Sequence, residues 1–72
     1  MEKLLIYVVT YNHENFIEKN LNRIDKKLFE NYDTEILVND DSSNDDTLKI
    51  IKDIKNNFKQ NAKFTILSNP KN

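Results

Sequence analysis

The chain has 72 residues, and its eleven basic and twelve acidic side chains leave a net charge of −1. A charge so close to zero gives no electrostatic reason to expect nucleic acid or an anionic membrane as a partner. The absence of cysteine excludes a disulfide framework, a thiolate metal site and a cysteine nucleophile.

The chain shows no repeat, linker or internal boundary, so we expect one small domain spanning residues 1–72. Its longest apolar run, residues 4–9, is too short to span a membrane. The residues before that run lack the features of a signal peptide. We therefore expect no membrane span and a cytoplasmic location.

The first predicted element is a strand. LLIYVV (Leu4–Val9) is a continuous apolar run rich in β-branched and aromatic residues, which is typical of a parallel strand buried on both faces. After TYNHEN, apolar residues recur every three or four positions with polar residues between them. This period predicts one amphipathic helix over residues 14–29.

The second half of the chain repeats this alternation. EILVN (Glu35–Asn39) predicts a second strand, the helical period returns over residues 47–58, and KFTILS (Lys63–Ser68) predicts a third strand. Strands separated by helices of this length run parallel, with right-handed crossovers. The predicted fold class is therefore α/β: a Rossmann-like β-α-β-α-β half of a three-layer, doubly wound fold with a parallel sheet.

Open sheets of this kind bind ligands beyond the carboxyl ends of their strands. Two segments are expected there, Thr10–His13 after the first strand and Asp40–Ser43 after the second. The chain contains no glycine, which excludes the dinucleotide-binding fingerprint and the Walker loop. Side chains would therefore have to hold any nucleotide by its base or ribose end.

Two pairs of adjacent aspartates follow the second strand. Asp40 and Asp41 can accept hydrogen bonds from a base or a ribose, or bind a metal, and a solvated turn is the alternative. An EF-hand is rejected, because Asp45 holds the position of the required glycine and Ile51 that of the bidentate glutamate. We expect Asp45 and Asp46 to cap the helix that follows, where they would also repel a phosphate.

The loop after the first strand offers three more polar side chains. Asn12 can cap the first helix or contact a ligand. Tyr11 can present its ring to a base, although a tyrosine at a strand end more often packs its ring and exposes its hydroxyl. His13 is the only histidine and has no visible acid or nucleophile partner, so we predict no catalytic residue in this chain.

Two stretches together resemble the start of family 2 glycosyltransferases of the GT-A fold: VVTYNHENFIEKNLNRI (residues 8–24) and YDTEILVNDDSSNDDTLKIIKDI (residues 32–54). In that family the first strand typically ends in Pro-Thr-Tyr-Asn and the second in an Asp-Asp-Gly-Ser turn. The resemblance implies the N-terminal, nucleotide-sugar-binding segment of an enzyme that transfers a sugar to an acceptor. The expected donor is a UDP-sugar.

The resemblance also implies roles for individual residues. Thr10 and Tyr11 would border the base and the ribose, with Asn12 beside them in the same nucleotide-binding loop. Asp40 would accept a hydrogen bond from the base, and Asp41 would stabilise the loop or reach the ribose. Ser42 stands where the family has glycine, so it would be strained if that position needs a positive φ. A milder departure is valine in place of the proline before Thr10.

Other family features are absent from the sequence. Family members carry a metal-binding Asp-x-Asp motif after a fourth strand and a catalytic base beyond it, and this chain has no Asp-x-Asp. We therefore expect no metal ligand and no cofactor in this chain, a divalent metal (Mn or Mg) in the full-length enzyme, and no transfer by the chain alone.

The alternative function is a non-catalytic nucleotide-binding or oligomerisation module. Without a fourth strand, the outer edge of residues 4–9 would be open, and an open apolar edge invites pairing with another chain. We therefore expect a homo-oligomer formed through the first strand. A receiver-like signalling domain fits less well, because its acidic pair would follow the first strand rather than the second.

Overall fold

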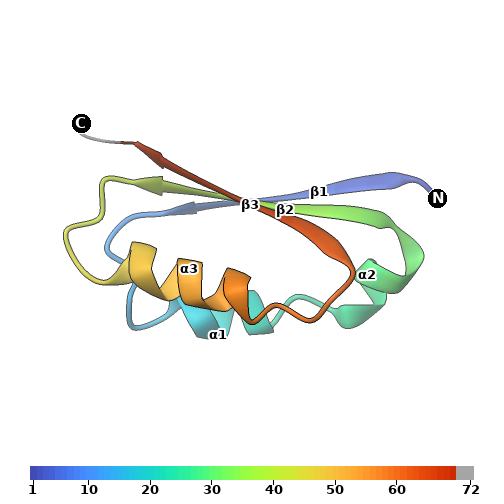
Figure 1. Cartoon of the computed structure of the whole chain (residues 1–72), viewed down its shortest axis with the longest axis horizontal. Coiled ribbons are helices and arrows are strands. Elements are labelled where there is room, and N and C mark those ends of the chain that lie inside the picture. The colour runs from blue at the N-terminus through green and yellow to red at the C-terminus, as the bar shows by residue number, and fades with distance from the viewer. Residues whose placement is uncertain (70–72) are drawn as a thin grey trace.

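The computed structural model describes residues 1–69, which form a three-stranded parallel sheet packed against helices (Figure 1). The strands are β1 (Lys3–Thr10), β2 (Asp33–Asp41) and β3 (Ala62–Asn69), in the order β1-β2-β3. Both pairings are parallel, and β2 is the central strand. The predicted β-α-β-α-β order and parallel sheet are confirmed.

The first crossover contains two short helices, α1 (Ile17–Asn22) and α2 (Lys26–Asn31), so the prediction of one helix over residues 14–29 is wrong. The helical conformation is interrupted before Asp25, the N-cap of α2. The backbone of Asp25 is extended, and its side chain accepts a hydrogen bond from the amide of Lys27 at 2.9 Å. The apolar period runs through this break without interruption, which is why it did not reveal the capping aspartate. The second crossover is the single helix α3 (Thr47–Asn56).

All three helices lie on one face of the sheet (Figure 1). Right-handed crossovers that move twice in the same direction place both connections on the same side. Ile36 and Val38 face the helices and are fully buried. Leu5, Tyr7 and Val9 are each more than half exposed, so the prediction that the first strand is buried on both faces is wrong. The described residues thus form two layers, a sheet and a helical layer.

The hydrophobic core lies between the sheet and the helices. Its buried side chains are Ile17, Leu21, Phe29, Ile36, Val38, Ile51 and Phe64. The half-buried ring of Phe58 contacts Phe29 and Phe64 edge to face, with ring centroids 5.6 Å and 5.2 Å apart. Within residues 1–69, no helix has both the length and the apolar character needed to cross a membrane.

Candidate functional site

The strand register brings the two predicted loops to the same end of the sheet. Thr10 is paired with Asp40 across β1 and β2, and Asp40 is paired with Ser68 across β2 and β3. The side chains of Thr10 and Asp40 face the helical layer and are each only 1% exposed. The Thr10 hydroxyl donates a hydrogen bond of 2.8 Å to Oδ1 of Asp40. A buried hydrogen bond thus joins the end of β1 to the end of β2.

Asp40 receives two further hydrogen bonds, both from Ser43. The Ser43 amide donates to Oδ2 at 3.1 Å, and the Ser43 hydroxyl donates to Oδ1. Both carboxylate oxygens of Asp40 are therefore occupied within the chain. A base N–H that bonded to Asp40, as the resemblance implies, would have to compete with these donors.

Asn12 connects the first loop to the second. Its amide donates to the Ser43 hydroxyl oxygen at 2.9 Å, and its side-chain Oδ1 accepts from the Asn44 amide at 2.7 Å. Asn12 has a φ of 49°, in the left-handed region that asparagine tolerates better than most residues. Its side chain does not cap α1, whose N-cap is Phe16, without a side-chain cap. The structure thus uses Asn12 to join the two loops.

Asp41 and Ser42 are held by the end of β3. The Ser42 hydroxyl donates to the Asn69 carbonyl at 2.7 Å, and the Asn69 side-chain amide donates to Oδ1 of Asp41 at 3.3 Å. Ser42 has a φ of 57°, so the position where the family has glycine does require a positive φ here. Asp41 is partly exposed, and Tyr11 is 52% exposed. Among the predicted site residues, Tyr11, Asn12 and Asp41 reach the surface, and Thr10 and Asp40 lie beneath it.

Asp45 stabilises the start of α3. Its Oδ1 accepts from the Thr47 amide at 3.0 Å and from the Thr47 hydroxyl, and its Oδ2 accepts from the Glu14 amide at 3.2 Å. Desolvation raises the pKa of Asp45, but these hydrogen bonds together outweigh it and hold the pKa below its usual value. The prediction that Asp45 caps the helix is confirmed. Asp46 is the N-cap residue but makes no side-chain cap bond, so that part of the prediction is wrong.

Two further hydrogen bonds connect the start of α3 to the loop after β1. Oε2 of Glu14 accepts from the Asp46 amide at 3.3 Å, and the His13 amide donates to the buried Thr47 hydroxyl oxygen at 2.7 Å. The carboxylates of Glu14 and Asp45 thus accept backbone amides at a helix end that in many nucleotide-binding folds receives a phosphate. Over the described part of the chain, no group of three or more histidine, aspartate or glutamate side chains is arranged to hold a metal ion.

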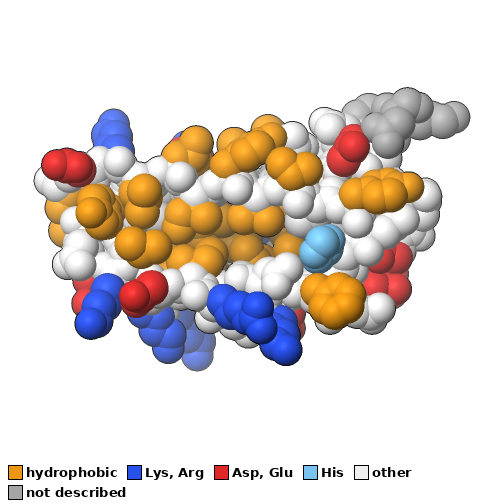
Figure 2. Space-filling view, turned by 180° about the vertical axis from the view of Figure 1, so that it is seen from behind, with side chains coloured by type: hydrophobic (Ala, Val, Ile, Leu, Met, Phe, Trp, Pro, Cys, Tyr) orange, Lys and Arg blue, Asp and Glu red, His pale blue; other side chains and the backbone are white. Residues whose placement is uncertain are grey.

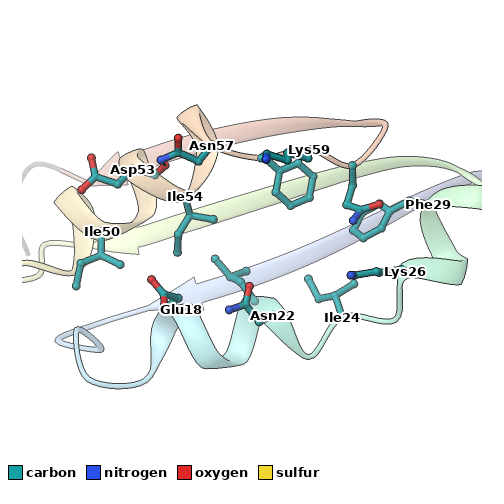
Figure 3. Close-up of a pocket in the computed structure, with 13 residues that line it drawn as sticks. Glu18, Asn22, Ile24, Lys26, Phe29, Ile50, Asp53, Ile54, Asn57 and Lys59 are labelled. Atoms are coloured by element: carbon teal, nitrogen blue, oxygen red, sulfur yellow. The ribbon is translucent and has the colours of Figure 1, made fainter.

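A separate groove of about 480 Å³ lies on the helical layer, between α3 and the two helices of the first crossover (Figure 3). Its floor is apolar and includes Ile24, Phe29 and Ile54. Charged side chains stand along it, including Glu18 and Lys26. None of the predicted site residues at the strand ends lines this groove, so it is distinct from the loop site.

A parallel sheet with two interlocked polar loops at its carboxyl end defines the half of a Rossmann-like α/β fold that the sequence predicted. The chain belongs to glycosyl transferase family 2, whose model matches residues 5–72. The resemblance seen in the sequence is therefore confirmed at the level of the family and the fold class.

Two bacterial relatives illustrate the match. An uncharacterized glycosyltransferase of Mycoplasma genitalium, MG060, is 44% identical over 52 residues, which is 72% of this chain and 18% of that protein. TarS of Staphylococcus aureus, named as a poly(ribitol-phosphate) beta-N-acetylglucosaminyltransferase, is 39% identical over 56 residues, which is 78% of this chain and 10% of that protein. The matched region is thus less than a fifth of either relative. No solved structure gives a significant match.

Proposed function

We propose that this chain is the nucleotide-binding N-terminal part of a glycosyltransferase that uses a nucleoside diphosphate sugar, with a UDP-sugar as the donor. The observation that carries the proposal is the pair of joined loops at the carboxyl end of the sheet, which present Tyr11 and Asp41 at the surface. Family membership supports the reaction class. The name of the relative TarS supports a nucleotide-linked amino sugar as one candidate donor.

Tyr11 and Asp41 are the residues we assign to the nucleotide. Oδ2 of Asp41 accepts no hydrogen bond from the residues that the structure describes, so it is available to an N–H of the base or a hydroxyl of the ribose. The exposed ring of Tyr11 offers an apolar face for the base. The resemblance gives the base contact to Asp40. Because Asp40 is buried and both its oxygens are occupied, we assign that contact to Asp41.

The diphosphate would lie away from the start of α3, because the carboxylates of Glu14 and Asp45 already accept backbone amides at that helix end. The described residues show no cluster that fits Mn²⁺ or Mg²⁺. In the complete enzyme, we expect the metal ligands and the catalytic base to come from outside residues 1–69. Sugar transfer by the isolated chain would contradict this division of roles.

The direct test is an NMR titration of the ¹⁵N-labelled chain with UDP, and with GDP and ADP for comparison, each with and without magnesium. We expect saturable shifts around Tyr11 and Asp41 that are largest with UDP and independent of magnesium. Asp41→Asn should weaken UDP binding by about ten- to a hundredfold, since a hydrogen bond to a charged group contributes roughly 1.5–3 kcal/mol.

Asp33→Asn is the matched control, because it removes the same charge at the exposed amino end of the same strand. It should leave UDP binding unchanged. A folded sample without saturable shifts, or equal losses in the two variants, would overturn the proposed site.

One observation favours a second function, the oligomerisation module. The outer edge of β1 is unpaired within the described sheet, and the adjacent side chains Leu5, Tyr7 and Val9 are 56%, 53% and 60% exposed. In the view from behind, hydrophobic side chains gather in a band across the middle of the molecule (Figure 2). We propose that two copies pair through their β1 edges, because such an edge offers free backbone donors and acceptors.

Sedimentation of the chain over a range of concentrations tests this pairing. We expect a dimer that Leu5→Lys converts to a monomer, because a charge would then stand beside the paired edges. Leu67→Lys is the control, since Leu67 is 48% exposed on the same face but lies on β3. A wild-type chain that stays monomeric at high concentration refutes the pairing.

A further inference from the structure

We infer that Asp40 is a positioning residue, which acts through Ser43 to set the loop of Tyr11 and Asn12 against the loop of Asp41. The inference rests on the proposed nucleotide-binding function and assigns Asp40 a role without direct contact to the nucleotide. It separates two adjacent acids that the sequence presents as a pair.

The first support is the environment of Asp40. Its side chain is 1% exposed, on the helical side of the sheet, in line with the buried residues Ile36 and Val38 of the same strand. A buried carboxylate is tolerated when hydrogen-bond donors satisfy its oxygens. The Thr10 hydroxyl and the amide and hydroxyl of Ser43 supply such donors. Each oxygen of Asp40 thus has at least one hydrogen-bond donor within the chain and does not depend on a ligand.

The second support is the hydrogen bond that Ser43 makes to Asn12 in the first loop. The Ser43 hydroxyl donates to Asp40 and accepts from the Asn12 amide, so its hydrogen atom and its lone pair have fixed directions. The Asn12 side chain in turn holds the Asn44 amide. Asp40, Ser43, Asn12 and Asn44 therefore form one continuous hydrogen-bonded connection between the two loops, and Tyr11 lies next to its first-loop anchor.

The connection also explains the backbone of Asn12. A non-glycine residue with φ at 49° is held in a sparsely populated region, which requires support from its surroundings. The bonds to Ser43 and Asn44 provide that support on the amide and on the side chain. Loss of Asp40 as an acceptor frees the Ser43 hydroxyl to rotate, and Asn12 then loses a fixed partner.

Asp40→Asn is the informative variant because it keeps the shape and changes the hydrogen-bonding character. The amide has one acceptor oxygen where the carboxylate has two. If that oxygen serves the Ser43 amide, which cannot rotate, the new NH₂ group faces the hydroxyls of Thr10 and Ser43. Both hydroxyls must then turn, and the bond that orients Ser43 toward Asn12 is disturbed.

The free chain gives the first readout. We expect Asp40→Asn and Ser43→Ala to change the same signals, namely the amide shifts and hydrogen exchange of Asn12 and Asn44 and the ³J coupling that reports φ of Asn12. Asp41→Asn is the control and should leave these signals unchanged. Slow exchange of the Ile36 and Val38 amides verifies that each variant is folded. If Asp40→Asn does not fold, Ser43→Ala alone decides, and unchanged Asn12 signals in it overturn the inference.

UDP binding gives the second readout. Asp40→Asn and Ser43→Ala should each weaken binding by roughly three- to tenfold, as expected for one hydrogen bond of about 1 kcal/mol. The double variant should bind about as well as the weaker single variant, because both changes break one connection. Effects that multiply would show that Asp40 acts independently of Ser43 and would overturn the inference.

The two readouts also separate this inference from the proposed function. If the folded wild-type chain does not bind UDP, the proposed function fails, and the Asn12 and Asn44 signals alone decide whether Asp40 positions the loop. If UDP binds and the free-chain signals of Asp40→Asn match the wild type, the proposed function stands and the positioning role falls.

Discussion

The two faces of the sheet are built from similar residues but have opposite surroundings. Along β2, Ile36 and Val38 face the helices and are fully buried, whereas Leu37 between them faces outward and is only partly buried. On β1, Leu5 and Val9 face outward and remain more than half exposed. Apolar character therefore does not decide burial here. Both crossovers lie on one side, and that side alone is covered.

The same division separates the two acids at the end of β2. Successive side chains of a strand point to opposite faces. Asp40 therefore continues the buried row of Ile36 and Val38, and Asp41 continues the outward row. The two neighbouring carboxylates therefore differ: Asp40 accepts hydrogen bonds inside the fold, and Asp41 is accessible to a ligand.

The largest expected loss of stability comes from a substitution on the face of the sheet that the helices cover. Ile36→Ala should lower the free energy of unfolding by about 2–5 kcal/mol, because it removes buried methyl and methylene groups and leaves a cavity. Leu37→Ala on the next position of the same strand should cost clearly less, since its side chain is partly in solvent already. Urea denaturation of both variants measures the difference. Equal losses would mean that the outward face is covered in solution.

The next effect concerns Asp45, on the loop side of the helical layer. Its pKa is lowered in the folded chain, so its ionised form stabilises the fold above the unfolded pKa, and that stability is lost as pH falls through the folded pKa. Asp45→Asn should therefore lower the melting temperature at neutral pH. The difference from the wild type should shrink as pH falls below the usual value of 3.8.

Asp46→Asn is the control for this pH series, because Asp46 makes no side-chain cap bond. Its melting temperature should follow the wild type closely at every pH. A difference between wild type and Asp45→Asn that persists unchanged to low pH would contradict a stabilising carboxylate at Asp45.

A smaller effect is expected at Ser42, where the second loop turns toward the end of β3. Ser42 has a φ of 57°, and a left-handed conformation costs a non-glycine residue roughly 1–2 kcal/mol. Ser42→Gly and Ser42→Ala both lose the hydrogen bond to the Asn69 carbonyl, but only glycine relieves the backbone. The glycine variant should be more stable than the alanine variant by about 1 kcal/mol.

The matched pair at Ser68 should give the opposite order. Ser68 lies within β3, where glycine is less favourable than alanine by roughly 0.5–1 kcal/mol. Chemical denaturation of the four variants provides the comparison. If alanine were the better residue at both positions, the positive φ of Ser42 would not be a feature of the folded chain in solution.

Sequence reasoning predicted the three strands, the second crossover helix and the meeting of the two polar loops at one end of the sheet, but not the division between faces. Hydrophobic period and the TYN and DDSS segments predicted three parallel strands with polar loops at one end. The break at Asp25 was missed, because a capping aspartate does not interrupt the apolar period. The roles of Asp40 and Asp41 depend on which of the two side chains points toward the helices. Two adjacent aspartates in a sequence do not reveal this orientation.

The signal for the inner role of Asp40 was nevertheless present. Counting back in twos along β2 gives Val38, Ile36 and Thr34, all buried, and this row could have been extended to Asp40. The partner Ser43 could not be found this way, because it depends on the turn at Ser42, which brings the Ser43 amide and hydroxyl back to the carboxylate. Turn geometry is a three-dimensional property that the spacing of the acids leaves open.

The smallest effect tests whether the outward face is bare in solution. Nζ of Lys63 lies 3.8 Å from Oε2 of Glu35 on that face, and the two side chains are 75% and 38% exposed. An exposed ion pair contributes about 0–1 kcal/mol and weakens with salt, so Lys63→Ala should cost at most a few tenths of a kcal/mol and nothing at high ionic strength. Lys52→Ala, an exposed lysine on α3, is the matched control. A salt-independent loss well above 1 kcal/mol would mean that another layer desolvates this pair, because removing one partner of a buried ion pair is costly. That result would erase the contrast between the two faces, whereas a negligible loss would confirm that only the helical side of the sheet is covered.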